Sequence, residues 1–239
     1  TGVTSALLDE VCEWENVRAH CTIEAARIGV LGEMLGFDRL LLDDAVIAAL
    51  LHDGHKKQEI EAIEEALRNG KSSRAASVAS ATKYLETLKS KNISSRTLRF
   101  ISLVGGMPDA LIGIKTILNK KSLSDEDMAA LAVHYVDNYT RDDEWVIPAE
   151  HTGGKTVNDV DRRETRNESN QKYKKIYDEI TKVIRDHPFF TGMSAFEAMV
   201  AVSHEIERRI ARAIEARNGI RIIPWEIPEV VDEKIKSAI

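Results

Sequence analysis

The 239-residue chain contains only two cysteines, Cys12 and Cys21, and they form no Cys-x-x-Cys motif. Both fall in a helical pattern, so we expect reduced, packed thiols rather than a disulfide framework. No apolar run approaches the ~20 residues that cross a bilayer. No basic segment followed by an apolar one opens the chain. We therefore expect a cytoplasmic protein with no membrane partner.

The chain also lacks an excess of basic residues, because 33 Lys and Arg stand against 39 Asp and Glu and give a net charge of -6. General nucleic-acid binders usually carry a basic balance, so nucleic acid is not an expected partner. Residues 71–99 are the local exception, with seven basic residues and one Glu. This segment could attract an anionic substrate or nucleic acid, but solvated helix faces are the simpler interpretation.

Hydrophobic residues make up 43% of the chain and recur at helical spacing almost throughout. In residues 15–36, apolar positions three and four apart mark one helix face, and Gly36 fits its C-terminal stop. Residues 40–53 predict a second helix whose middle is apolar all round, as in a helix surrounded by protein. Further helices are predicted over residues 58–70, 72–92, 94–106, 108–121, 124–140, 171–186 and 194–219. No strand alternation occurs outside the tail, so the predicted fold is all-α.

Composition divides the chain into three parts. Residues 1–145 predict a helical domain, and residues 171–239 predict a helical extension that packs on the same body. Residues 146–170 between them are polar and contain a Gly pair, and loops of this length are uncommon unless functional or disordered, so we expect a loop or lid. The tail from residue 220 carries two prolines around a Trp. We expect it to lie against the body or against a second copy of the chain in a homodimer.

Four polar residues in three predicted helices point to chemistry. His20 lies at the margin of the first apolar face, and the pair His52-Asp53 ends the next helix. Asp137 lies on a later helix that is apolar on two sides, so its carboxylate should be partly buried. A buried carboxylate is costly unless it is paired or bound to a metal. Taken singly, His20 would be interpreted as an ordinary half-buried histidine, and Asp137 as a partner for Arg141 at i,i+4 spacing.

Taken in order, the segments ENVRAHCTIEAARIG, AALLHDGHKK and VHYVDNY resemble the HD-domain superfamily of metal-dependent phosphohydrolases. The resemblance covers roughly residues 14–141. It implies an HD-type helical bundle in which His20, His52, Asp53 and Asp137 hold one divalent metal ion. Two imidazoles and two carboxylates suit Mn, Fe, Co, Ni or Zn, and Mg is less favoured by nitrogen. The implied activity is hydrolysis of a small phosphorylated substrate, with a nucleotide as the best guess, and Asp53 would also orient the attacking water.

The histidine content departs from the multi-metal branches of that superfamily, which use extra histidines between the His-Asp pair and the last Asp. Residues 54–136 contain only His55 and His134, and neither lies on an intervening helix. A single-metal hydrolase is therefore favoured over a metal-dependent oxygenase, which remains an alternative.

Lys56 is the second departure, because single-metal nucleotidases of the superfamily tend to carry Glu at this position. A lysine binds phosphate as a point charge but is a poor base unless burial lowers its pKa. Lys56 and Arg18 are thus candidates for phosphate contact, and His55 joins Asp53 and Lys56 as a candidate for catalysis. Each could equally be a solvated surface residue. If the missing Glu abolishes turnover, the chain is instead a regulatory or scaffold HD domain.

Overall fold

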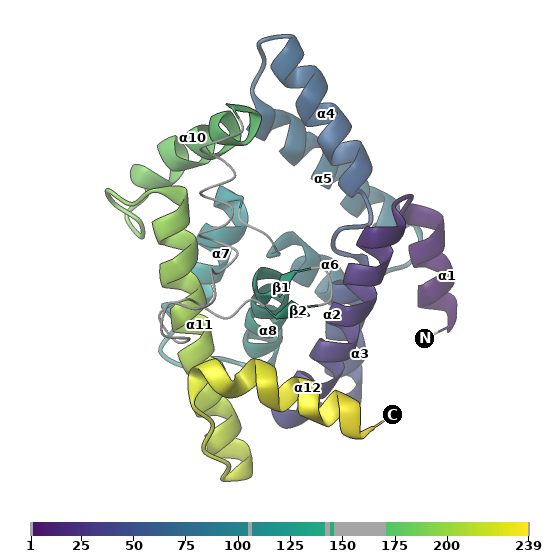
Figure 1. Ribbon diagram of the computed structural model, residues 1–239, viewed down its shortest axis with the longest axis vertical. Helices are drawn as coiled ribbons and strands as arrows, with labels where there is room; N and C mark the ends of the chain where they lie inside the picture. The colour runs from purple at the N-terminus through teal and green to yellow at the C-terminus, as the bar shows by residue number, and fades with distance from the viewer. Residues whose placement is uncertain (1, 105–106, 142–143, 146–170, 239) are drawn as a thin grey trace.

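The computed structural model describes residues 2–104, 107–141, 144–145 and 171–238, and these residues form an all-α fold (Figure 1). The α-helices are α1 (Gly2–Val11), α2 (Glu15–Met34), α3 (Arg39–Leu51), α4 (Lys56–Arg68), α5 (Ser73–Ser90), α6 (Ser95–Ser102), α7 (Pro108–Leu118), α8 (Asp125–Tyr139), α10 (Gln171–Arg185), α11 (Ala195–Asn218) and α12 (Ile227–Ser237). A short 3₁₀ helix, η2 (Pro224–Glu226), precedes α12, and two-residue strands β1 (Thr140–Arg141) and β2 (Glu144–Trp145) pair antiparallel after α8. The all-α prediction is confirmed.

Helix α8 is the central element, and α2, α3, α6, α7 and α11 all pack against it (Figure 1). Its start is fixed by a capping box, in which the Ser124 hydroxyl accepts from the Asp127 backbone N–H and the Asp127 carboxylate accepts from the Ser124 N–H. Every residue from 127 to 136 is buried. Alanines at 129, 130 and 132 let the neighbouring helices approach closely. Asp137, at the end of this buried run, is therefore carried into the interior, as the sequence predicts.

Helices α2 and α3 form a helical hairpin that packs along most of its length. Gly36 ends α2 with a positive φ of 65°, a conformation that glycine adopts without steric cost. The Asp38 side chain then caps α3 by accepting a hydrogen bond from the Leu41 N–H. These two local signals orient the hairpin that carries His20, His52 and Asp53 of the candidate site.

The C-terminal helices share the hydrophobic core of the N-terminal region. Helix α11 packs on α7 and α8, α10 packs on α5, and α12 packs on α2. Ile227 and Val231 of α12 are fully buried, so the tail lies against the body, although as a helix and without a strand in residues 220–238. The predicted loop or lid over residues 146–170 falls outside the described residues. None of the described helices is long and apolar enough to span a membrane.

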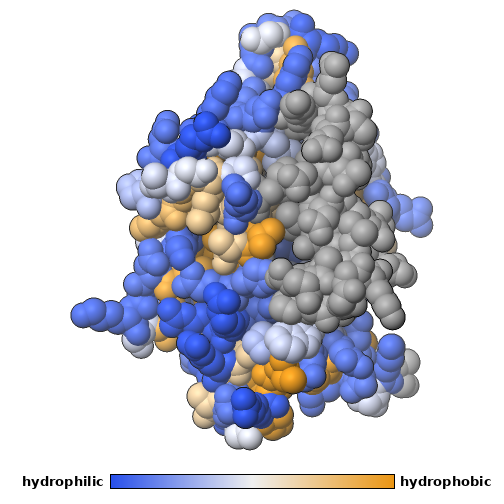
Figure 2. Space-filling view, turned by 60° about the vertical axis from the view of Figure 1, so that its left-hand side comes forward, coloured by the Kyte–Doolittle hydropathy of each residue, from blue (hydrophilic) through white to orange (hydrophobic). Residues whose placement is uncertain are grey.

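The face in Figure 2 is mostly hydrophilic and carries smaller, separate apolar areas. The exposed large hydrophobic residues of the described chain are Leu40, Val78, Ile220, Ile223 and Trp225.

The sequence does not predict α1, α12 or the β1–β2 pair. The helix predicted from residue 58 begins two residues earlier in the structure, at Lys56 of α4.

Candidate metal centre

Four side chains from three helices converge in the interior: His20 and Glu24 from α2, His52 at the end of α3, and Asp137 from α8. One ligand atom from each lies within 4.8 Å of the other three. His20 Nε2 lies 2.8 Å from Glu24 Oε1, and His52 Nε2 lies 3.3 Å from Asp137 Oδ1. These four residues are called the His/Glu/His/Asp cluster below. It can hold one metal ion.

Local helix geometry explains why the groups meet. His20 and Glu24 are four residues apart, so they lie on the same face of α2, one turn from each other. The His52 backbone N–H donates to the Ala48 carbonyl and extends α3 by one residue. The His52 ring Nδ1 then donates to the Ala49 carbonyl at 2.8 Å. That bond fixes the tautomer and leaves Nε2 facing Asp137, as second-shell bonds do for metal-binding histidines.

The interior of the cluster contains polar atoms that the protein does not satisfy. Glu24 and His52 are 1% and 5% exposed. Among the described residues, neither Glu24 Oε1 nor His52 Nε2 makes a hydrogen bond of good geometry, despite the short distances above. Buried polar atoms without such bonds are costly. A cation coordinated by both atoms would remove that cost, so the donor set fits a divalent metal.

Charge in the metal-free cluster is balanced by protons. Burial opposes the charged form of His20, but the adjacent carboxylates of Asp137 and Glu24 raise its pKa to about 10. The pKa of His52 is also raised, against burial, by the nearby Glu24 carboxylate. Burial likewise disfavours ionised Asp137, yet its close contacts with His20 and His52 hold its pKa well below the usual range. Both imidazoles are therefore in the cationic, doubly protonated form at neutral pH. A metal ion must displace one proton from each ring that it binds.

Glu24 is the member of the cluster that the sequence does not predict. It interrupts the apolar face of α2, between Cys21 and Ile28, both fully buried. A glutamate at a core position, one turn from a candidate ligand histidine, is the signal that could have identified it.

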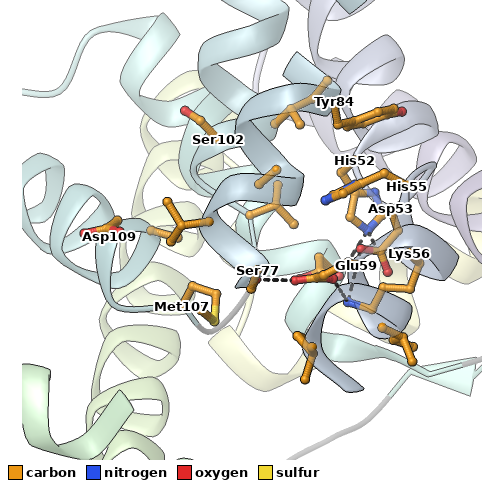
Figure 3. A pocket seen from close by; sticks show the side chains of 18 of the residues that line it. His52, Asp53, His55, Lys56, Glu59, Ser77, Tyr84, Ser102, Met107 and Asp109 are labelled. Carbon is orange, nitrogen blue, oxygen red and sulfur yellow. Dashed lines mark hydrogen bonds and ion pairs between the residues drawn. The ribbon is translucent and has the colours of Figure 1, made fainter. Parts of the chain in front are cut away.

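Asp53, predicted as a metal ligand, lies beside the cluster and is not one of its four members. Its Oδ2 is 3.9 Å from His52 Nε2, and its Oδ1 is 3.5 Å from Lys56 Nζ. Lys56 Nζ is also 3.3 Å from an oxygen of Glu59, so this ammonium lies between two carboxylates (Figure 3). Asp53 and then Glu59 raise the pKa of Lys56, against burial, so it is a cation and not a base. Asp53 as a metal ligand stays a prediction.

His55 packs flat on Tyr84, with ring centroids 4.5 Å apart and planes 12° apart. Both ring nitrogens are buried, and neither has a hydrogen-bond partner among the described residues. Burial lowers the pKa of His55, although Glu59 and Asp53 oppose that shift, so the ring is neutral at pH 7. A neutral imidazole with two unpaired nitrogens can donate to or accept from a bound ligand.

These groups form one end of a cavity of about 520 Å³. The predicted residues that line it are His20, His52, Asp53, His55, Lys56 and Asp137. The remaining lining comes from α4, α5, α6, α7, α10, the segment between α6 and α7, and Thr140 of β1. Arg18 is not part of the lining, and its guanidinium instead donates to Asp9 of α1 at 3.1 Å. Glu59 lines the cavity and is a further charged residue that the sequence does not predict.

His134 is buried, and its Nδ1 donates to the Leu103 carbonyl at 2.7 Å. It lies outside the His/Glu/His/Asp cluster. In the part of the chain that the structure describes, no second group of three or more metal-binding side chains converges.

The basic segment over residues 71–99 is partly neutralised, because four of its side chains pair with carboxylates on other helices: Arg74, Lys91, Arg96 and Arg99. The solvated interpretation of that segment is thereby favoured.

A scan against protein-family models and searches of curated proteins and of solved structures give no match to this chain. The function is therefore argued from the site alone.

Proposed function

We propose that the protein is a metal-dependent phosphohydrolase of the HD type, acting on a small phosphorylated substrate. The observation that supports the proposal is that a metal-binding set and a phosphate-binding lysine line the same cavity. A set of two imidazoles and two carboxylates can hold a divalent ion, and a lysine beside it can bind a phosphate oxygen. The resemblance of the ordered His, His-Asp and Asp segments to HD-domain hydrolases supports the same conclusion.

A divalent metal ion, when bound, supplies a Lewis acid for a phosphoryl oxygen and lowers the pKa of water. The protein's own groups supply the rest. Lys56 Nζ pairs with a phosphate oxygen as a point charge, exchanging part of its contact with Asp53 or Glu59. Asp53, half-buried at the edge of the cluster, accepts a hydrogen bond from the attacking water and orients it. Neutral His55 takes the proton that the attacking water loses, and the imidazolium that forms returns it to the leaving oxygen.

A carboxylate is also available near the position where related nucleotidases carry Glu. Glu59 follows Lys56 by one helical turn, lines the same cavity, and accepts a 2.5 Å hydrogen bond from Ser77. Its presence favours an active hydrolase over a purely regulatory or scaffold domain. The single convergent cluster among the described residues favours the hydrolase over a two-iron oxygenase.

The test is phosphate release from a panel of phosphomonoesters and nucleotides with Mn²⁺, Co²⁺, Mg²⁺ or EDTA. We expect metal-dependent release that Asp53→Asn abolishes. Asp43→Asn is the matched control, because Asp43 is an exposed carboxylate on α3 that pairs only with Arg39 among the described residues. Absence of release from protein that elemental analysis finds loaded with metal would overturn the proposal. Two iron atoms per chain would favour the oxygenase.

A further inference from the structure

The lining of the cavity narrows the class of substrate. We infer that the site takes a phosphomonoester with a single phosphate group and an apolar organic part, in preference to a nucleotide or a sugar phosphate. This inference rests on the proposed function and deepens it.

The first argument is the supply of positive charge. Lys56 is the one Lys or Arg among the described residues that line the cavity, whereas Asp53, Glu59, Asp109 and Asp137 all line it. Lys56 is already shared between two carboxylates. Together with one divalent ion, whose charge is shared with Glu24 and Asp137, this lysine offsets only part of the charge of a phosphate dianion. A triphosphate, with about twice that negative charge at neutral pH, would meet uncompensated carboxylates, which is unfavourable in a partly desolvated cavity.

The second argument is the apolar wall away from the metal centre. Half of the 26 described residues that line the cavity have aliphatic, Met or Tyr side chains. They include Ile60 and Ile63 of α4, Val104, Met107 after α6, and Ile176 of α10. Met107 lies across the cavity from His52 and Lys56 (Figure 3). An apolar group of a ligand anchored at the metal centre would be removed from water against this wall.

The third argument is that most polar groups of the wall are occupied within the protein. Four lining hydroxyls donate to protein acceptors: Ser73 to Glu179, Ser77 to Glu59, Thr82 to the Val78 carbonyl and Ser102 to the Arg99 carbonyl. Asp109, at the far side, pairs with Arg74 at 3.2 Å. Recognition of a sugar or nucleobase requires free donors and acceptors that match its polar edges. The described lining offers such groups mainly at the metal end, where both His55 nitrogens are unpaired.

Small side chains on α5 create the width for the apolar part. Ser73, Ser77 and Ala81 follow one another at intervals of four residues, so they lie on one helix face, and all three line the cavity. Ala81 is half-buried, and a larger apolar side chain there would fill cavity space without burying a polar group. Ala79, on the same helix, is exposed and outside the lining, which makes it a matched control position.

The experiment uses the full chain loaded with Mn²⁺ and measures kcat/KM for ethyl, butyl and hexyl phosphate. These esters share a primary alkoxide leaving group, so differences report binding of the alkyl chain. We expect kcat/KM to rise about two- to fourfold per added methylene, as expected for burial of CH₂ groups. Glycerol phosphate, glucose 6-phosphate, AMP and ATP should all fall below hexyl phosphate.

Direct binding separates this inference from the proposed function. Calorimetric titration with ethyl- and hexylphosphonate, which are not hydrolysed, should give tighter binding of the hexyl compound. Ala81→Leu should lower the affinity for hexylphosphonate about tenfold, because the larger side chain fills the outer part of the cavity. The affinity for ethylphosphonate should change by less than about twofold. Ala79→Leu should change neither.

Equal affinity for the two phosphonates, or a kcat/KM for AMP or glucose 6-phosphate above that for hexyl phosphate, would overturn the substrate class. Chain-length-dependent phosphonate binding with no phosphate release under any metal would overturn the hydrolase proposal while supporting the assigned ligand chemistry. Metal-dependent phosphate release that does not depend on chain length would support the hydrolase proposal and overturn the substrate class.

Discussion

Glu24 Oε1 lies 2.8 Å from His20 Nε2, and the two residues are one turn apart on α2. The glutamate is almost fully buried, whereas the histidine reaches the cavity. The rest of the cluster holds this deeply buried carboxylate in place. Substitution of Glu24 therefore tests whether the cluster binds a cation.

We expect Glu24→Gln to lower the affinity for Mn²⁺ by at least about tenfold, because removing an anionic group at a metal site costs that much or more. Isothermal titration calorimetry measures the change. The control is Glu33→Gln, since Glu33 is an exposed glutamate on the same helix. Unchanged affinity in Glu24→Gln would remove Glu24 from the ligand set.

Metal binding is expected to release protons at pH 7. The pKa of His20 is raised to about 10 and that of His52 is also raised, so both rings are protonated in the metal-free protein. A ligating imidazole must be neutral, so we expect release of between about one and two protons per ion, and affinity that increases with pH. Calorimetry in buffers of different ionisation enthalpy gives the number. Heats that do not depend on the buffer would contradict the expectation.

The stability of the metal-free protein should depend on pH in a defined direction. A histidine whose pKa is raised on folding stabilises the fold below its unfolded pKa, and that stabilisation is lost as the pH rises through its folded pKa. For His20 this window runs from the ordinary histidine pKa of 6.5 to about 10. Urea denaturation in EDTA should therefore give a falling free energy of unfolding across the window. His20→Gln should flatten the slope, and an equal slope in that variant would assign the effect elsewhere.

Lys56→Met tests phosphate contact separately from metal binding. Lys56 Nζ contacts Asp53 and Glu59 and no member of the cluster in the described structure. We expect KM for a phosphomonoester to rise at least about tenfold, since a charge-assisted contact is lost, while Mn²⁺ affinity changes little. Lys57→Met is the control, because Lys57 pairs with Glu13 and does not line the cavity. A KM unchanged in Lys56→Met would leave the phosphate without its proposed partner.

Gly54, directly after the His52-Asp53 pair, has no room for a side chain. A Cβ there would meet the Tyr84 hydroxyl and would lie 2.9 Å from Val11 Cγ2. That hydroxyl donates to the Leu51 carbonyl at 2.6 Å and joins α5 to the end of α3. We expect Gly54→Ala to lower the free energy of unfolding by about 1–3 kcal/mol through overpacking.

Gly29, inside α2, is the matched control for Gly54, because nothing lies within 4 Å of its added Cβ. Gly29→Ala should raise the free energy of unfolding by about 0.5–1 kcal/mol, since alanine is the better helix former. Both values come from urea denaturation. Equal effects of the two substitutions would contradict the close packing of Tyr84 on the turn.

Helical spacing was sufficient to predict the all-α fold and the helices that carry His20, His52 and Asp137, because a repeating apolar face is a property of each segment alone. The sequence does not predict a helix in the tail, since its prolines are typical helix breakers. In the structure Pro224 and Pro228 occupy the first turns of η2 and α12, where a missing N–H costs nothing.

The site could be predicted only in part. His20, His52 and Asp137 are brought together as expected, and Asp53 lies next to them. Glu24 is not predicted, because a glutamate in a helix is usually solvated and its burial here depends on tertiary packing. The cavity wall could not be predicted, because it combines side chains from α4, α5, α7 and α10 whose proximity depends on tertiary packing.

The His/Glu/His/Asp cluster joins α2 to α8, and His20 and Asp137 are 117 positions apart in the sequence. An ion held by both helices is a cross-link between the first part of the bundle and its central helix, and it closes a long loop of chain. Separation of α2 from α8 must then release the ion, so bound metal opposes that separation. Loading with metal should therefore raise the resistance of α8 to hydrogen exchange.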